Sequence, residues 1–226
     1  ARRERYLFLT TTAKNNRCNK IAVAHNRDDQ AETFLHRLIR GSGLRGFQGM
    51  AYKSSRGGVS IIRPLLCCFR KEIEDYINIC GITACQDHSN YDTKFTRNKI
   101  RHELVSYLEQ NFNPNIKEVL FNTSCTMQEL YGFIESQAYA AFKRCVKKEG
   151  DCVNINQDRL KKLHPYIITE VIRMAFELVK GDLKRFEYAH YKEIESLIYK
   201  RPVGSVVDLP AGIKVVKNKH WLTIGR

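Results

Sequence analysis

The sequence has 226 residues, of which 43% are hydrophobic and 27% are charged. That length suits one large domain or two small ones, and the apolar content excludes a predominantly disordered chain. Lysine and arginine together exceed the acidic residues by 14, which favours a polyanionic partner, with nucleic acid ahead of an anionic membrane. No apolar run approaches the roughly 18 residues of a membrane span, and the basic start ARRERYLFL lacks the apolar stretch of a signal peptide.

The eight cysteines favour a reducing compartment. No two of them have the C-x-x-C spacing that is typical of a zinc or redox site. Cys67 and Cys68 are adjacent, and this spacing suits neither a metal clamp nor a simple disulfide. Without a secretory signal, we expect reduced thiols in a cytoplasmic protein.

Strands and helices alternate in the first half of the chain. The predicted elements, in chain order, are a strand at Lys20–Ala24, a helix at Ala31–Arg40, a strand at Val59–Ile62 and a helix at Lys71–Cys80. Asp29, with Glu32 three residues later, predicts a capping box at the start of the first helix. This alternation predicts an α/β fold with a parallel sheet.

The second half is predicted to be mostly helical. A polar loop at Ile82–Asn98 leads to a helix at Lys99–Gln110, and the chain then breaks at Asn111–Pro114, where Asn113 would cap a helix that starts at Pro114. We therefore expect domains at 1–110 and 111–226. The further elements expected are one long helix from Asn115 to Glu149, helices at Pro165–Lys180 and Glu187–Lys200, and a β-meander of Val206–Leu209, Ile213–Val216 and Trp221–Ile224.

Polar residues gather where the first predicted strand meets its helix. His25, Asp28, Asp29 and Glu32 follow the strand, and ligands bind at the carboxyl ends of strands in open α/β sheets. These groups are able to hold a metal, an ammonium group or a reacting base. A capped helix start with a solvated face explains Asp29 and Glu32 equally well.

Glycine and arginine mark two candidate phosphate contacts. The GSGLRG stretch from Gly41 spells G-x-G-x-x-G, but it follows a helix instead of opening one, so we reject a dinucleotide site. A tight loop beside Arg40 and Arg45 would expose backbone N–H groups to phosphate, although an ordinary helix stop is also consistent. Arg97 and Arg101 are four residues apart and share a helix face if the helix begins before Lys99, which suits a phosphate chain or a solvated basic helix start.

Five blocks in this order and spacing resemble the bacterial tRNA(Ile)-lysidine synthetase family of N-type PP-loop ATPases. They are AHNRDDQAET, RLIRGSGLRGFQGM, IIRPLL, DHSNYD and TRNKIRHEL. The resemblance is strong up to about residue 110 and looser beyond it. It implies a parallel-sheet PP-loop ATPase domain, like the adenine nucleotide alpha hydrolases, followed by a mostly α tRNA-binding domain with a small β tail.

The resemblance also implies a reaction. Enzymes of this family use ATP to adenylate the wobble cytidine of an isoleucine tRNA with a CAU anticodon, and free L-lysine then displaces AMP to give lysidine. Magnesium accompanies the ATP chemistry. The family analogy admits a homodimer and implies a cytoplasmic enzyme with no membrane partner.

Residue roles follow from the matched blocks. Asp29, Glu32 and Arg5 resemble the lysine-binding residues, and His25 and Asp28 belong to the catalytic block. The resemblance assigns no metal ligand. The resemblance places Arg97 and Arg101 near the nucleotide or the tRNA. The further candidates that we name for nucleotide or tRNA contacts are Arg40, Gly41, Gly43, Arg45, Arg63 and Asn90.

One departure qualifies this prediction. The family's S-G-G-x-D-S loop, which cradles pyrophosphate on backbone N–H groups, has no counterpart in these residues. We therefore expect an N-terminally incomplete PP-loop domain that is inactive without an upstream segment. The alternatives are a tRNA-thiolating PP-loop enzyme, which would favour C-x-x-C ligands, and a non-catalytic tRNA-binding relic, which leaves the acids in a basic domain unexplained.

Overall fold

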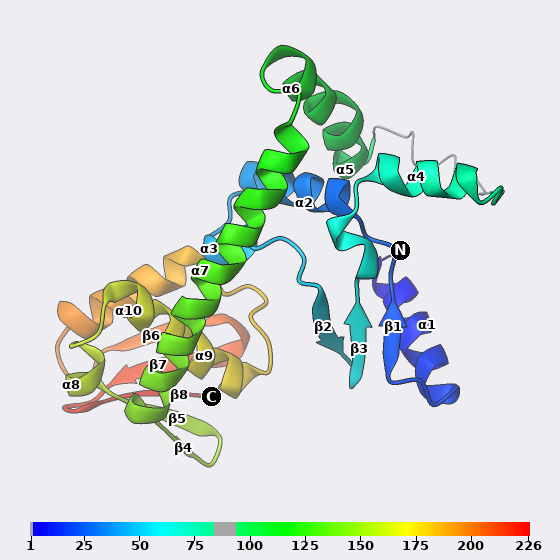
Figure 1. The fold of residues 1–226 in the computed structure, drawn as a ribbon. Helices are drawn as coiled ribbons and strands as arrows, with labels where there is room; N and C mark the ends of the chain where they lie inside the picture. The colour runs from blue at the N-terminus through cyan, green and yellow to red at the C-terminus, as the bar shows by residue number, and fades with distance from the viewer. Residues whose placement is uncertain (1, 84–93) are drawn as a thin grey trace. The chain divides into compact units, whose positions relative to one another are not determined.

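The computed structural model describes residues 2–83 and 94–226. The chain forms two compact units, 1–131 and 132–226, and the division falls within helix α7 (Ile116–Cys145) (Figure 1). The domain boundary expected after residue 110 stays a prediction. No helix in the described ranges is long and apolar enough to cross a membrane.

A small mixed sheet organises the first unit. Its strands are β1 (Lys20–Ala22), β2 (Lys53–Arg56) and β3 (Val59–Ile62), in the order β1-β3-β2. The predicted parallel arrangement is present between β1 and β3, whereas β2 was not predicted and pairs antiparallel with β3. Gly57 and Gly58 both have positive φ, which suits the tight hairpin between β2 and β3.

The other elements of the first unit are helical, and one of these helices packs on the sheet. Helix α1 packs against β1 and β3, and a separate apolar cluster joins the α2 residues Phe34 and Leu35 to Ile100, Val105 and Leu120. The helical segments are α1 (Arg2–Asn15), α2 (Arg27–Arg40), α3 (Leu44–Phe47), η1 (Pro64–Cys67), α4 (Arg70–Ile79), α5 (Thr96–Lys99), a π-helical turn η3 (Ile100–Val105) and α6 (Ser106–Asn111).

Helix α2 begins one turn earlier than predicted. Its N-cap is Asn26, whose side-chain oxygen accepts from the backbone N–H of Asp29 at 2.9 Å, and Asp29 Oδ2 accepts from the N–H of Asn26 at 3.0 Å. The predicted cap at Asp29 is therefore wrong. The reason is that the extended backbone of Asn26 lets this residue end the strand segment and cap the helix, and Asp29 becomes the third helical residue.

Other helix boundaries also differ from the predictions, and the helix expected from Lys99 begins at Thr96, within the predicted loop. Helix α7 starts at Ile116 instead of Pro114, because Asn113 first forms a turn in which its side chain accepts from the N–H of Asn115. The long helix ends at Cys145, because the next four residues pair with another strand as β4.

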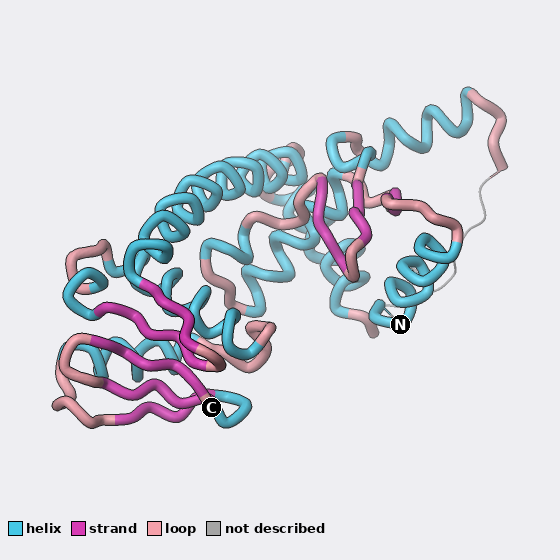
Figure 2. The backbone as a smooth tube through the Cα atoms, turned by 90° about the horizontal axis from the view of Figure 1, so that it is seen from below, coloured by secondary structure: helices cyan, strands magenta, loops and turns pink. Residues whose placement is uncertain are grey.

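The second unit is built on a five-stranded antiparallel sheet (Figure 2). The three strands predicted in the tail are confirmed, and an unpredicted hairpin extends them. The strands are β4 (Val146–Glu149), β5 (Cys152–Asn156), β6 (Val206–Leu209), β7 (Ile213–Lys217) and β8 (Trp221–Gly225), in the order β4-β5-β8-β7-β6.

Two long helices pack on this sheet and close its core. Helix α9 (Pro165–Lys180) contacts β5 and β8, and α10 (Tyr188–Tyr199) contacts β6 and β7, while the short α8 (Gln157–Leu160) follows β5. Alternate strand residues such as Ile155, Leu222 and Ile224 are fully buried among them. Such apolar burial is the main source of stability for this unit.

Lys217 is a buried cation that ties the end of α10 to β7. Its ammonium donates to the carbonyls of Ile198 at 3.0 Å and Arg201 at 2.6 Å. Burial, with a smaller contribution from the charge of Lys161, lowers the pKa of Lys217. The lysine therefore satisfies the Ile198 carbonyl in the last turn of α10 and the Arg201 carbonyl just beyond the helix.

Replacing this lysine tests the assignment. Lys217→Met keeps the apolar stem but leaves two carbonyls without their donor, so we expect a loss of about 1–3 kcal/mol in the free energy of unfolding. Urea denaturation measures it. Lys214→Met, an exposed position on the same strand, is the control and should change stability by less than about 0.5 kcal/mol. Equal effects at the two positions would contradict the assignment.

Candidate functional site

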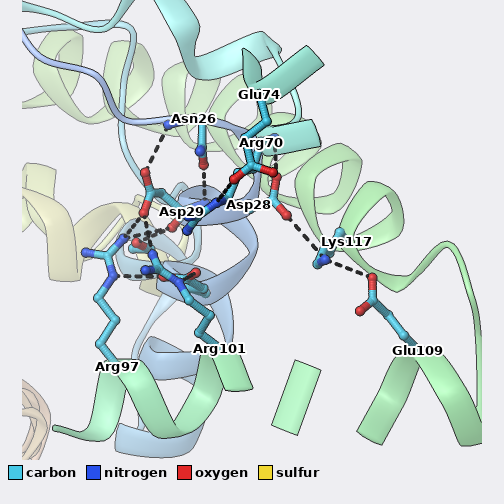
Figure 3. Close-up of polar contacts among 11 residues, drawn as sticks. Asn26, Asp28, Asp29, Arg70, Glu74, Arg97, Arg101, Glu109 and Lys117 are labelled. Atoms are coloured by element: carbon cyan, nitrogen blue, oxygen red, sulfur yellow. Dashed lines mark hydrogen bonds and ion pairs between the residues drawn. The ribbon is translucent and has the colours of Figure 1, made fainter. Parts of the chain in front are cut away.

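Two acids of α2 meet two arginines from the region of α5 (Figure 3). Asp29 Oδ1 lies 3.0 Å from Arg97 Nη2 and 3.1 Å from Arg101 Nη2. Glu32 Oε2 lies 2.9 Å from Arg97 Nε, and Glu32 Oε1 lies 2.5 Å from Arg101 Nε. Each guanidinium thus bridges both carboxylates. We call these four residues the acid–arginine cluster.

Helix geometry explains why the four side chains meet. Asp29 and Glu32 are three residues apart and Arg97 and Arg101 four apart, so each pair shares a helix face. Glu32 is only 3% exposed, and a buried carboxylate needs such partners. Burial lowers the pKa of Arg101, but hydrogen bonding to Glu32 and the charges of Glu32, Asp29 and Asp28 outweigh it, so this pKa is raised. The predicted shared face of Arg97 and Arg101 is thus confirmed, and it lies against Asp29 and Glu32.

A cavity of about 430 Å³ opens beside the cluster. Arg5 reaches it from α1 and His25 from the segment after β1. The cavity therefore lies at the carboxyl end of β1, where α/β sheets bind ligands, and its volume is typical of a small-molecule site. Its lining comprises Arg5, Tyr6, Leu9, Val23, Ala24, His25, Asp29, Arg97, Asn98 and Arg101.

Asp28 does not join the other acids. Its Oδ2 accepts from the backbone N–H of Arg70 at 2.8 Å, and its Oδ1 lies 3.3 Å from Lys117 Nζ (Figure 3). Adjacent residues on a helix point about 100° apart, and in this structure Asp28 and Asp29 form ion pairs with different cations. Asp28 lines a second cavity of about 190 Å³, whose wall also includes Glu32 and Arg101.

Lys117 is a site residue that sequence reasoning missed. It lies on α7 and forms ion pairs with Asp28 of α2 and Glu109 of α6. Its ammonium lies 3.0 Å from Glu109 Oε1 as well as close to Asp28. Burial lowers the pKa of Lys117, but the hydrogen bond to Glu109 and the charges of Asp28 and Glu109 outweigh it, so this pKa is raised. No local signal points to Lys117, because its partners are distant in the sequence.

Arg27 is a second residue that sequence reasoning missed. Its guanidinium lies between the rings of Phe69 and Phe121, at 4.4 and 4.3 Å from their centroids. Its backbone N–H donates to the carbonyl of Cys68 at 2.9 Å. These cation–π contacts hold the first turn of α2 between α4 and α7.

Gln30 is the third missed residue, and it fixes a loop. The side chain is fully buried, its Nε2 donates to the carbonyl of Met50 at 3.1 Å, and its Oε1 accepts from the N–H of Met50 at 2.7 Å. Gly49 has φ of 64°, and a Cβ there would come within 2.5 Å of Gln30. The one sequence signal that could have identified Gln30 is that it is a polar residue next to the apolar positions of α2.

The remaining predicted contacts lie elsewhere. Arg63 is buried and donates to the carbonyl of Ala51 at 2.6 Å, so it braces the strands. Asn90 lies outside the described residues. Arg40, Gly41, Gly43 and Arg45 lie in or beside the exposed connection from α2 to α3. Within the described part of the chain, no three histidine, cysteine or acidic side chains come together to hold a metal.

A charge-removing substitution tests the cluster. Glu32→Ala leaves two partly buried guanidiniums with one carboxylate, and we expect a loss of about 1–3 kcal/mol in unfolding free energy by urea denaturation. The matched control is Glu74→Ala, which removes an exposed partner 2.7 Å from Arg70 and should cost less than about 1 kcal/mol. A Glu32 variant as stable as the Glu74 variant would contradict the structural role of the cluster.

Comparisons with known proteins identify relatives. Residues 1–108 match the PP-loop domain family. The tRNA(Ile)-lysidine synthase of Caldanaerobacter subterraneus subsp. tengcongensis is 36% identical over 220 residues, which cover 97% of this chain and 46% of that protein. The enzymes of the same name from Clostridioides difficile and Geobacter sulfurreducens are 35% and 34% identical, over 99% and 100% of this chain and 48% and 47% of those proteins.

The chain spans about half the length of these curated relatives. The similarity nevertheless runs through both compact units, because each alignment covers nearly all of residues 1–226. The chain therefore contains a PP-loop domain at residues 1–108 and is a homologue, over nearly its whole length, of the tRNA(Ile)-lysidine synthases.

Proposed function

We propose that this chain carries the lysine site of an ATP-dependent ligase that joins free L-lysine to the wobble cytidine of an isoleucine tRNA with a CAU anticodon. The curated names of the relatives and the PP-loop domain support ATP use and a tRNA substrate. The observation that carries the proposal is the Asp29 carboxylate in the wall of a cavity, with Glu32 bound to the same two arginines, in a chain of net charge +14. A carboxylate that lines a cavity can accept from a ligand ammonium in place of an arginine partner.

The composition of the cavity fits a free amino acid. Lysine carries two ammonium groups and one carboxylate, and the cavity offers Asp29 together with the guanidiniums of Arg5, Arg97 and Arg101. We assign the side-chain ammonium to Asp29 and Glu32, and the carboxylate to an arginine fork. Because both acids already have arginine partners, the incoming ammonium shares or replaces a guanidinium, and this frees positive charge for the phosphates of ATP.

His25 and Asp28 take different roles in this proposal. His25 lines the same cavity as Asp29, so we assign it proton transfer at the amine that attacks the activated cytidine. Asp28 is held by Arg70 and Lys117, and we assign it the alignment of α2 with α4 and α7. Adenylation transfers AMP to the cytidine oxygen and releases pyrophosphate, and we propose that Mg²⁺ arrives with the ATP phosphates.

The RNA contact is assigned to the lysine-rich second half. Residues 111–226 carry 13 of the 19 lysines, and mobile ammonium groups suit a sequence-independent phosphate surface. We also assign the exposed Gly41–Arg45 connection and the polar segment around Asn90 to nucleotide or RNA contacts. A cytoplasmic location and a homodimeric assembly, which follow from the family resemblance, belong to the same proposal.

The alternatives have less support. A tRNA-thiolating enzyme of this fold would be expected to use C-x-x-C ligands, and the sequence has none. A non-catalytic tRNA-binding protein explains the positive charge but gives no role to a cavity of small-molecule size that Asp29 and His25 line. The three curated relatives are each named tRNA(Ile)-lysidine synthase, which matches neither alternative.

Amino-acid binding tests the proposed site directly. We expect L-lysine to bind at least about tenfold more tightly than norleucine, which has no side-chain ammonium, in calorimetric titrations. Asp29→Asn should remove this preference, because it removes one negative charge from the cavity. Asp75→Asn, on the exposed face of α4, is the matched control and should retain it. Equal binding of lysine and norleucine to the unaltered chain would refute the lysine site.

Incorporation of labelled lysine tests the reaction. A polypeptide that contains residues 1–226 together with an upstream S-G-G-x-D-S segment should label isoleucine tRNA transcripts with a CAU anticodon when ATP is present, and His25→Ala should lower the rate about 10²-fold or more. Product analysis by mass spectrometry identifies the modified nucleoside. Sulfur incorporation instead of lysine would favour the thiolating alternative and overturn the proposal.

A further inference from the structure

Two adjacent thiols stand close together outside the proposed lysine site. Cys67 Sγ and Cys68 Sγ are 3.9 Å apart, and both are free cysteines. Cys67 is exposed, and Cys68 is half-buried. Because the two side chains face each other across a single peptide bond, they form a dithiol that solvent reagents reach from the Cys67 side.

The backbone next to this dithiol is attached to the start of α2. The carbonyl of Cys68 accepts from the N–H of Arg27 at 2.9 Å, and the N–H of Arg70 donates to Asp28 Oδ2 at 2.8 Å. Between them, the ring of Phe69 lies against the Arg27 guanidinium. The 67–70 turn, which joins η1 to α4, therefore holds the first turn of α2 at three points.

We propose that Cys67 and Cys68 are a reversible redox modification site, oxidised by hydrogen peroxide to a disulfide between neighbouring residues. One thiolate attacks the peroxide, the O–O bond breaks, and the resulting sulfenic acid releases water when the second thiol attacks its sulfur. In total, two thiols lose two protons and two electrons, one S–S bond forms, and one peroxide becomes two waters. This proposal is independent of the proposed function, since it involves neither ATP nor RNA.

Bond geometry makes the oxidised state strained. The sulfurs must move from 3.9 Å to about 2.05 Å apart, and the Cα atoms of adjacent residues lie only about 3.8 Å apart, below the usual disulfide range of about 4.4–6.8 Å. The adjacency that argues against a simple structural disulfide therefore favours a labile one, since strained disulfides are readily reduced. The strain falls on the backbone of the 67–70 turn, so oxidation weakens its bonds to Arg27 and Asp28.

Mass spectrometry tests the modification on the chain itself. We treat the reduced protein with hydrogen peroxide, block the remaining thiols with an alkylating reagent and digest it. The expected result is a peptide that contains Cys67 and Cys68, lacks two hydrogens and carries no alkyl group, and that dithiothreitol returns to a doubly alkylated form. Continued alkylation of both thiols, or oxidation of either one only to sulfinic or sulfonic acid, would overturn the proposal.

Variants and amide exchange test the link to α2. Cys67→Ser removes an exposed thiol and should abolish both the disulfide and the effect of peroxide on exchange at the Arg27 and Arg70 amides, whereas Cys18→Ser, at another exposed thiol, should change neither. In the unaltered chain, oxidation should speed hydrogen exchange at the Arg27 and Arg70 amides by about tenfold or more. If the disulfide forms without faster exchange at these amides, the link to α2 is refuted. Circular dichroism confirms that each variant is folded.

Discussion

The pairing of two carboxylates with two guanidiniums is the constraint on which the first unit depends. The carboxylates of Asp29 and Glu32 lie on one face of α2, and Glu32 is almost fully buried. A buried carboxylate is tolerated only with charged or hydrogen-bonding partners, so the segment that carries Arg97 and Arg101 must lie against this face. The cavity beside the cluster is a consequence of that placement, because α1 and the end of β1 complete its wall.

The start of α2 distributes its polar side chains among different partners. Asn26 caps the helix, Asp28 turns toward α4 and α7, Asp29 turns toward the arginines, and Gln30 holds the loop before β2. Because successive helical residues point in different directions, the polar side chains at residues 26–30 contact several neighbouring elements at once. Residues 26–32 are thus both a structural hub and the proposed ligand site.

Local signals predicted much of this fold, and non-local contacts account for the rest. Helix α9 and the three tail strands carry strong periodic patterns and were predicted closely, whereas strand β4 follows α7 without a breaker and is a strand because it pairs with β5. Helix spacing correctly placed Arg97 and Arg101 on one face. Two contacts depend instead on tertiary packing between residues that are distant in the sequence. They are the contact of Arg97 and Arg101 with Asp29 and Glu32 and the ion pair of Lys117 with Asp28. The separate direction of Asp28 follows from helix geometry once the true start of α2 is known.

In the proposed site, Asp29 and Glu32 recognise a ligand ammonium beside the arginines that hold them. A crystal structure of the chain with bound L-lysine provides the test. We expect the side-chain ammonium about 2.8 Å from a carboxylate oxygen of Asp29 or Glu32, with at least one guanidinium contact of the cluster lengthened or exchanged. Lysine bound elsewhere, with the acid–arginine cluster unchanged, would rule out this site.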